Sequence, residues 1–263
     1  PPSVARPVHP VLFTLFGHPF YAYGACAAMG FLLAVWLWGR MAARAGLKKE
    51  DAGDLGAALL LSGIAGARAA YVVANWSFFA ANPAEIVRID HGGLIFYGGF
   101  VFGCLALVVF ARLKKWKLLD AADFAIVGLA ASHVCGRIGC FTRGCCFGGV
   151  AAKPWLGVVY PADCDAIPAA LQGGPLYPVQ LAEALLLAGV TVVLWRAWHK
   201  PHAPGAVFGL YLLVYPPLRF VLEFFRGDER QAFGAIDIAQ AVSIALFAVG
   251  VVWTFAVKKR AAR

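Results

Sequence analysis

The sequence predicts an all-α integral membrane protein whose helices cross the bilayer about seven times. Of its 263 residues, 61% are hydrophobic and only 14% are charged, and the mean hydropathy is +0.73. This apolar share exceeds that of ordinary soluble domains, and the chain holds repeated apolar runs long enough to span a bilayer, for which a helix needs about 20 residues. We expect one integral membrane domain over 1–263.

The spans follow one another with short connections. In chain order the predicted helices are 19–39, 54–80, 94–111, 120–137, 178–195, 205–225 and 235–256. The opening PPSVARPVHP lacks a basic region ahead of an apolar core, so we expect the first span to act as the targeting signal.

Basic residues predict the orientation of these spans. They gather in the connections on one side, at 40–49, 112–117, 196–200 and 258–263, and the side richer in Lys and Arg is normally cytoplasmic. The N-terminus is therefore expected outside and the C-terminus in the cytoplasm. The net charge of +9 is explained by topology and by attraction to membrane lipids, so we expect no nucleic-acid partner. The long connection 140–177, rich in Gly, Pro and Cys, is predicted to form an external loop region.

Two opposite charges lie at membrane depth in the run 205–225. Arg219 and Glu223 are four residues apart, and Tyr215 precedes Arg219 by one helical turn. A central charge costs roughly 2.5 to 3.5 kcal/mol to insert, so such residues usually face the bundle interior and mark a path for a polar substrate or ion. The pattern favours an enzyme or a transporter.

Two more arginines lie within predicted spans or at their ends. Arg68 follows Gly63 and Gly66, small residues that let a neighbouring helix approach closely, and it is either a ligand-binding group or a structural arginine bonded to carbonyls. Arg137 precedes a glycine-rich loop that includes Gly148. A guanidinium beside backbone amides suits a phosphate, because its planar fork donates two charge-assisted hydrogen bonds.

Other polar groups have simpler interpretations. Glu183, three residues after Gln180 at the start of a span, is interpreted as a charge that favours the positive end of a helix dipole. His133 stands on an apolar helix without a second histidine at ligand spacing, which favours a core residue over a metal ligand.

Four of the seven cysteines lie on the predicted outer side. Cys140, Cys145, Cys146 and Cys164 are expected to form at least one disulfide if that compartment is oxidising, although the sequence does not define the pairing. We expect no metal, since the spacing lacks two separated CxxC pairs. A membrane thiol oxidoreductase is the alternative use of these thiols, but the chain has CC in place of CxxC.

Several motifs in collinear order resemble the prolipoprotein diacylglyceryl transferase family. They are AYGACAAMGF (22–31), GARAAYVVANW (66–76), VRIDHGGLIFYGG (87–99), GRIGCFTRGCCFG (136–148), YPVQLAEAL (177–185) and YPPLRFVLEFFR (215–226). The chain departs from the family pattern at Tyr97, where His is common, and at Cys140, Arg143 and Cys145, where Asn, Asn and Glu are common.

The resemblance implies roles for particular residues. The catalytic set would be Arg137, Arg219, Tyr97 and Glu223, with Arg137 and Arg219 as the essential arginines. The substrate-binding residues would be Tyr23, Arg68, Cys140, Gly148, Gln180 and Tyr215.

The resemblance also implies the reaction. It would move the diacylglyceryl group of phosphatidylglycerol to the cysteine thiol in the lipobox of a prolipoprotein signal peptide, forming a thioether and releasing glycerol phosphate. No cofactor is expected. The enzyme would lie in the bacterial inner membrane with its active site toward the periplasm. The alternative is a lipid-binding or transport paralogue on the same scaffold that has lost catalysis.

Overall fold

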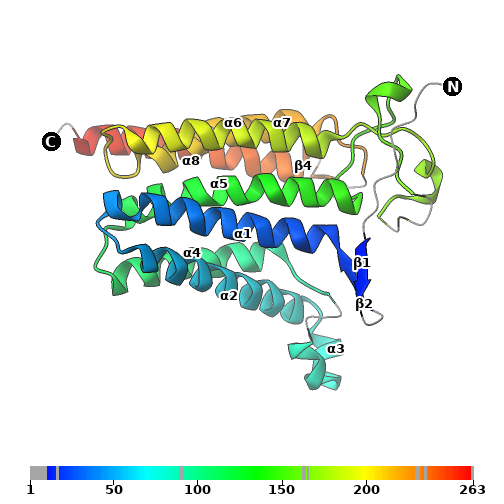
Figure 1. The fold of residues 1–263 in the computed structure, drawn as a ribbon, viewed down its shortest axis with the longest axis horizontal. Helices are drawn as coiled ribbons and strands as arrows, with labels where there is room; N and C mark the ends of the chain where they lie inside the picture. Colours follow the sequence, from blue (N-terminus) through cyan, green and yellow to red (C-terminus); the bar gives the residue numbers. More distant parts are fainter. Residues whose placement is uncertain are drawn as a thin grey trace. The chain divides into compact units, whose positions relative to one another are not determined.

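The computed structural model describes residues 11–15, 18–88, 92–161, 164, 166–228, 232–233 and 236–261. Seven helices in this part of the chain are long and apolar enough to cross a membrane, which confirms the predicted number (Figure 1). They are α1 (Ala22–Met41), α2 (Lys49–Ala74), α4 (Phe96–Leu113), α5 (Leu118–Arg143), α6 (Val179–His199), α7 (Ala206–Glu223) and α8 (Ile238–Ala261).

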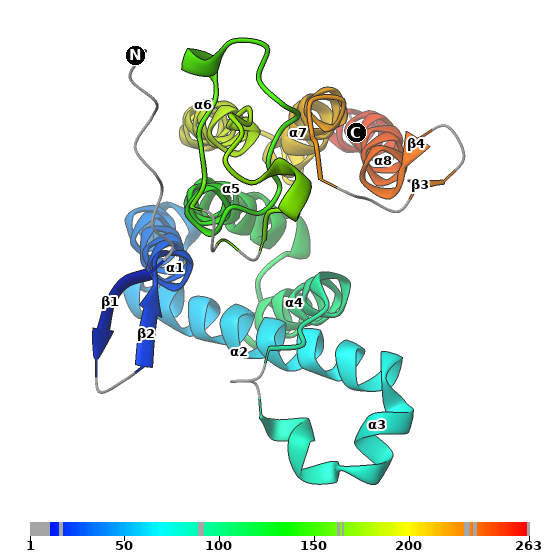
Figure 2. The same cartoon turned by 90° about the vertical axis from the view of Figure 1, so that its right-hand side faces the viewer.

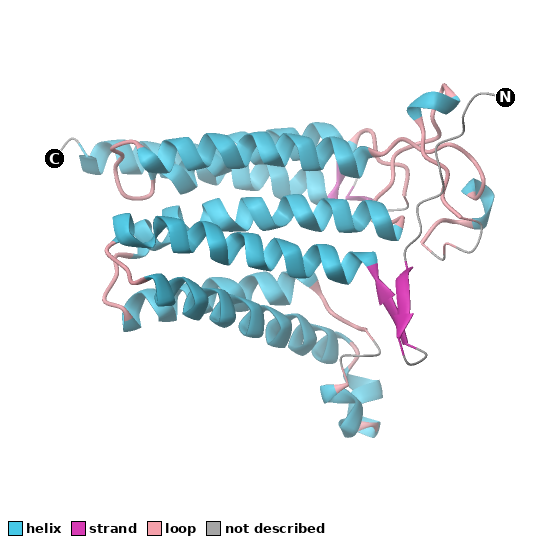
Figure 3. Cartoon of the chain, in the orientation of Figure 1, coloured by secondary structure: helices cyan, strands magenta, loops and turns pink. Residues whose placement is uncertain are grey.

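Helix predominates, as expected, and the remaining regular structure is small (Figure 3). The second span, predicted over 54–80, is divided in the structure: α2 ends at Ala74, and a separate short helix, α3 (Trp76–Ala81), follows it. The strands β1 (Val11–Leu15) and β2 (His18–Tyr21) form an antiparallel pair before α1. A second pair, β3 (Ala232–Phe233) and β4 (Ile236–Asp237), precedes α8.

The chain forms two compact units. The first contains 1–34 and 125–263 and the second contains 35–124, so α1 and α5 each contribute residues to both. The single-domain organisation stays a prediction.

In the second unit, α2 and α4 cross at glycines. A Cβ atom on Gly66 would lie 2.5 Å from the Gly98 carbonyl oxygen, and a Cβ atom on Gly99 would lie 2.9 Å from the Gly63 carbonyl oxygen. Because glycine has no side chain, the two backbones come into contact. Transmembrane helices associate through close packing of this kind, since lipid is as apolar as the helix surfaces and the hydrophobic effect does not drive them together. The predicted close approach at Gly63 and Gly66 is confirmed.

In the first unit, α6, α7 and α8 lie side by side, and α5 lies next to α6 (Figures 1 and 2). The first half of α1 packs against α5, where a Cβ atom on Gly30 would lie 2.9 Å from the Ser132 carbonyl oxygen. Because α6 and α7 run in opposite directions, the end of α5, the start of α6 and the end of α7 meet at one end of this unit.

The connection from α5 to α6 folds over that end and has a hydrophobic core of its own. Phe147, Tyr160, Cys164, Ile167 and Leu176 pack together and are almost fully buried. Isolated bridges join Val150 and Val158 to Leu176, and Gly148 to Arg226. The described residues of the predicted loop region 140–177 therefore form a packed cap. Gly144 turns the chain back at the end of α5 with a φ of +80°, a conformation that glycine adopts without strain.

Candidate functional site

Glu183 on α6 is the centre of a buried polar cluster. Its Oε1 atom accepts a hydrogen bond from the Tyr215 hydroxyl at 2.9 Å. The same oxygen lies 3.1 Å from Nε of Arg137 and 3.8 Å from Nε of Arg219. The Glu183 side chain is only 3% exposed, so two guanidinium groups from different helices meet one carboxylate oxygen away from water.

A second carboxylate extends this cluster along α7. Glu223 forms an ion pair with Arg219 one turn earlier, and its other oxygen lies 3.7 Å from Arg226. Arg226 also binds Asp228 with two contacts, at 2.9 and 2.5 Å. Arg219 is thus held between two carboxylates, an arrangement that compensates charge which would otherwise be costly to bury.

Helical spacing explains why these side chains face inward. The buried residues of α7 include Leu212, Pro216, Arg219 and Glu223, which recur at intervals of three and four and therefore share one face. On α6 the buried residues include Gln180, Glu183 and Leu187, by the same spacing. The charges lie on the faces that the two helices bury.

Sequence reasoning missed the central role of Glu183. Its place near the start of α6 favoured the dipole interpretation, but the carboxylate contacts α5 and α7. The available signal was the buried stripe of α6, on which Glu183 lies among apolar residues. His133, interpreted as a core residue, packs edge-on against the Tyr215 ring with centroids 5.5 Å apart.

Tyr23, predicted to bind substrate, lies near the end of α5. A Cβ atom on Gly139 would lie 3.1 Å from the Tyr23 ring, so the absence of a side chain at Gly139 admits the ring. The Tyr23 side chain is about half exposed, and it interacts electrostatically with Arg137 and Cys140. The structure therefore brings Tyr23, Arg137 and Cys140 together.

Gln180 and Gly148, predicted to bind substrate, have structural partners. The Gln180 side-chain amide donates to the Cys145 carbonyl oxygen at 2.8 Å and to the Tyr160 hydroxyl at 3.3 Å, which fastens the cap to α6. Burial raises the pKa of the Tyr160 hydroxyl, so it stays protonated. The Gly148 amide donates to Tyr177, and a Cβ atom on Gly148 would clash with that residue.

Arg68 in the second unit matches the structural interpretation. Its five N–H donors each meet a backbone carbonyl oxygen, those of Glu85, Ile86, Arg88, Gly92 and Gly93. The guanidinium also lies over the Tyr71 and Phe79 rings. These bonds fasten the loop after α3 to α2, and the substrate-binding role of Arg68 stays a prediction.

Tyr97 also belongs to the second unit. It lies at the start of α4, half exposed, with its ring edge-on to that of Phe96. Its catalytic role stays a prediction.

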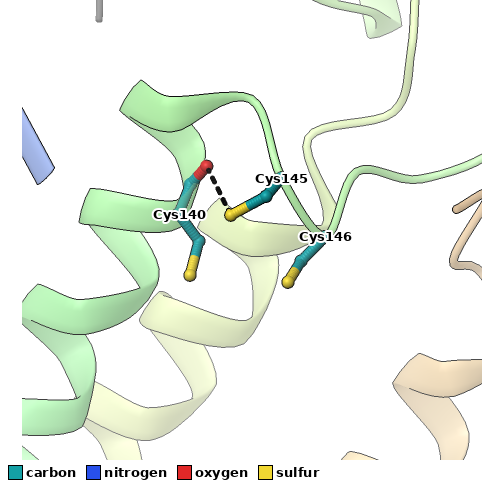
Figure 4. A group of neighbouring side chains, drawn as sticks. All are labelled: Cys140, Cys145 and Cys146. Atoms are coloured by element: carbon teal, nitrogen blue, oxygen red, sulfur yellow. Dashed lines mark hydrogen bonds between the residues drawn. The ribbon is translucent and has the colours of Figure 1, made fainter. Parts of the chain in front are cut away.

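All seven cysteines have free thiols in the structure. Cys145 directs its sulfur to the Cys140 carbonyl oxygen and Cys164 to that of Arg143, at 3.8 and 3.5 Å. Disulfide formation among the four outer cysteines stays a prediction. The sulfur atoms of Cys140, Cys145 and Cys146 nevertheless lie within 4.8 Å of one another, although their spacing did not predict a metal site (Figure 4).

The fold and the site define a multi-pass helical membrane protein with an arginine and carboxylate cluster buried between its helices, of the kind that membrane proteins use to handle charged substrates. The prolipoprotein diacylglyceryl transferase family model matches residues 10–256, and the chain belongs to this family of membrane transferases.

Named relatives cover nearly the whole chain. A phosphatidylglycerol--prolipoprotein diacylglyceryl transferase of Vibrio cholerae is 33% identical over 94% of this chain and 92% of its own length. That of Enterococcus faecalis is 33% identical over 93% and 89%. A second such enzyme of Clostridium perfringens is 30% identical over 92% of both chains.

Proposed function

We propose that this protein transfers the diacylglyceryl group of phosphatidylglycerol to the cysteine thiol in the lipobox of a prolipoprotein signal peptide. The sulfur would form a bond to the glyceryl carbon, the bond from that carbon to the phosphate oxygen would break, and glycerol phosphate would leave. The thiol proton would go to the leaving group or to water. The reaction balances with these two substrates alone and needs no oxidant.

The observation that carries this proposal is the convergence of Arg137 and Arg219 on one oxygen of Glu183. A shared carboxylate holds both guanidinium groups in one place and in fixed orientation. Their planar donors match the oxygens of a phosphodiester. Glu183, Glu223 and Tyr215 act in this proposal as positioning residues, because they contact the arginines or each other.

The change of charge during the reaction explains why two arginines would be required. The phosphodiester of the lipid carries one negative charge, and the departing phosphate monoester carries a second until it gains a proton. Donors that are already oriented stabilise this added charge more strongly in a site with little water than in bulk solvent. Because the stabilisation grows toward the transition state, it lowers the barrier as well as the dissociation constant.

Tyr23 and Tyr97 are each proposed to act on the lipid headgroup or on a proton. Tyr23 lies against α5 next to the Arg137 group and would orient the headgroup. Tyr97 would orient the headgroup or carry a proton in place of the histidine common in the family.

We place the reaction at the periplasmic side of the bacterial inner membrane. The basic connections, expected in the cytoplasm, lie at the helix ends opposite to the cluster: Arg196 ends α6 and Lys258 to Arg260 end α8. An impermeant thiol reagent applied to intact cells tests this. It would label a cysteine engineered into the cap ahead of Tyr177 and spare one after Ala261.

Turnover by the purified protein tests the proposed function. Detergent-solubilised protein would be mixed with phosphatidylglycerol and a lipobox peptide, with a cysteine-to-serine peptide as control. We expect glycerol phosphate and lipidated peptide in equal amounts, and neither with the serine peptide. Glycerol phosphate release without peptide modification would contradict the proposal. Tight lipid binding without turnover would support the non-catalytic paralogue.

A further inference from the structure

Three thiols gather where α5 ends and the cap begins. Cys140 lies in the last turn of α5, the chain reverses at Gly144, and Cys145 and Cys146 follow directly. All three side chains are half-buried. Their sulfur atoms lie within 4.8 Å of one another, and Figure 4 shows them grouped around a common space. The cluster supplies three ligands of one chemical type.

The spacing of the sulfurs fits a single metal ion. When three sulfurs each lie about 2.3 Å from one metal ion, they are roughly 3.8 to 4.0 Å apart. The sulfurs here lie within 4.8 Å of one another, so each sulfur–sulfur distance would shorten by about 1 Å or less on binding. Thiolate ligands select soft ions such as Cu⁺ and Zn²⁺, whereas carboxylate and carbonyl oxygens select Mg²⁺ or Ca²⁺. A disulfide would use two of these thiols and leave the third without a role.

Backbone and side-chain contacts hold the cluster in place before any ion arrives. The amides of Gly144 and Cys145 both donate to the Cys140 carbonyl oxygen, at 3.0 and 3.2 Å. Gln180 of α6 donates to the Cys145 carbonyl oxygen. Cys146 has a φ of 61°, a left-handed conformation that is uncommon for residues other than glycine. Such preorganisation reduces the ordering cost of binding.

Two positively charged side chains lie near the cluster and would stabilise thiolates bound to a metal ion. Arg137 and Arg226 both interact electrostatically with Cys146, and Arg137 also with Cys140. Three thiolates around Zn²⁺ carry one net negative charge, and around Cu⁺ they carry two. Two guanidinium groups close by offset that charge in a half-buried place.

We propose that Cys140, Cys145 and Cys146 bind one soft d10 metal ion, Zn²⁺ or Cu⁺, through three thiolates. Binding releases the thiol protons. Three protein ligands satisfy Cu⁺, whereas Zn²⁺ keeps a fourth position for water or another ligand, as in open zinc sites. The proposal concerns binding and stands apart from the proposed transfer reaction.

Equilibrium dialysis of the reduced, purified protein tests this site. Zn²⁺ and, under anaerobic conditions, Cu⁺ would be offered separately, and the metal retained would be measured by mass spectrometry. We expect one equivalent of at least one of the two ions. Cys140→Ser, Cys145→Ser and Cys146→Ser should each weaken binding by more than the ~10 to 100-fold that loss of an outer-shell contact costs. Cys104→Ser, on α4 and outside the cluster, is the matched control and should bind as the parent does.

Thiol protection tests the same site without a variant. In wild-type protein the ion should protect Cys140, Cys145 and Cys146 together from alkylation and leave Cys104 reactive, and a chelator should reverse this. The proposal is overturned if neither ion is retained, if Cys104→Ser lowers binding as much as the cluster variants, or if wild-type membranes contain a disulfide between two of the three.

Discussion

The Tyr215 hydroxyl donates a 2.9 Å hydrogen bond to Glu183, which joins α7 to α6 beside the two arginines. Tyr215 lies one turn before Arg219 on the buried face of α7, so the bond and the ion pair act on one carboxylate oxygen. Removing the hydroxyl leaves the aromatic packing intact. We expect Tyr215→Phe to lower glycerol phosphate release by about ten- to a hundredfold, since a hydrogen bond to a charged group contributes about 1.5 to 3 kcal/mol. Unchanged turnover would show that this bond does not position the site.

Neutralising Glu183 should be more damaging. Glu183→Gln keeps the size of the side chain but leaves Arg137 and Arg219 without their shared carboxylate. Breaking a buried ion pair costs about 3 to 5 kcal/mol, because a charge remains uncompensated. We expect a clear fall in the thermal unfolding midpoint in detergent together with a loss of turnover.

The matched control for that variant is Glu85→Gln. Glu85 pairs with Arg88 at 3.1 Å on an exposed surface, where such pairs contribute about 0 to 1 kcal/mol. Equal losses of stability in the two variants would contradict the central role of Glu183.

Lysine should not replace either arginine of the site. Arg137→Lys and Arg219→Lys keep the charge but replace a planar fork with a compact ammonium group. We expect each to reduce turnover by about a hundredfold, which corresponds to about 3 kcal/mol of transition-state stabilisation. Arg143→Lys, at the end of α5 with its guanidinium over the Tyr21 ring, is the control and should retain activity. Parent rates in both site variants would remove the guanidinium groups from the mechanism.

A variant of Arg68 distinguishes a structural role of this residue from a substrate-binding role. Arg68→Lys offers three donors in place of the five that bond the loop carbonyls. We expect faster proteolysis between Glu85 and Gly93 and an unchanged KM for phosphatidylglycerol. A raised KM with unchanged proteolysis would restore the substrate-binding role.

The crossing of α2 and α4 predicts a position-specific effect of alanine. Gly66→Ala would place a methyl group 2.5 Å from the Gly98 carbonyl oxygen, and overpacking of this kind typically costs about 1 to 3 kcal/mol. A Cβ atom on Gly103 of α4 would meet nothing within 4 Å. We expect Gly66→Ala to lower the thermal midpoint and Gly103→Ala to preserve or raise it, since alanine favours a helix. Similar midpoints would show that the helices can separate without cost.

The sequence alone determined the helical class, the seven spans and two of the site arginines. Length and hydropathy suffice for the spans, because a bilayer requires about 20 apolar residues per helix and every backbone hydrogen bond within it. Arg137 and Arg219 were found because charges in or beside apolar runs are costly and therefore rare. These are local properties of the chain.

Only the tertiary structure decided what the polar groups contact. Glu183 and Arg68 each had two physically reasonable interpretations, and the choice depended on which helix or loop lies opposite: α5 and α7 for Glu183, the carbonyl groups after α3 for Arg68. The three thiols likewise come together through the reversal at Gly144. Side-chain partners across helices depend on distances between segments far apart in the chain, and the spacing of residues along one helix does not contain that information.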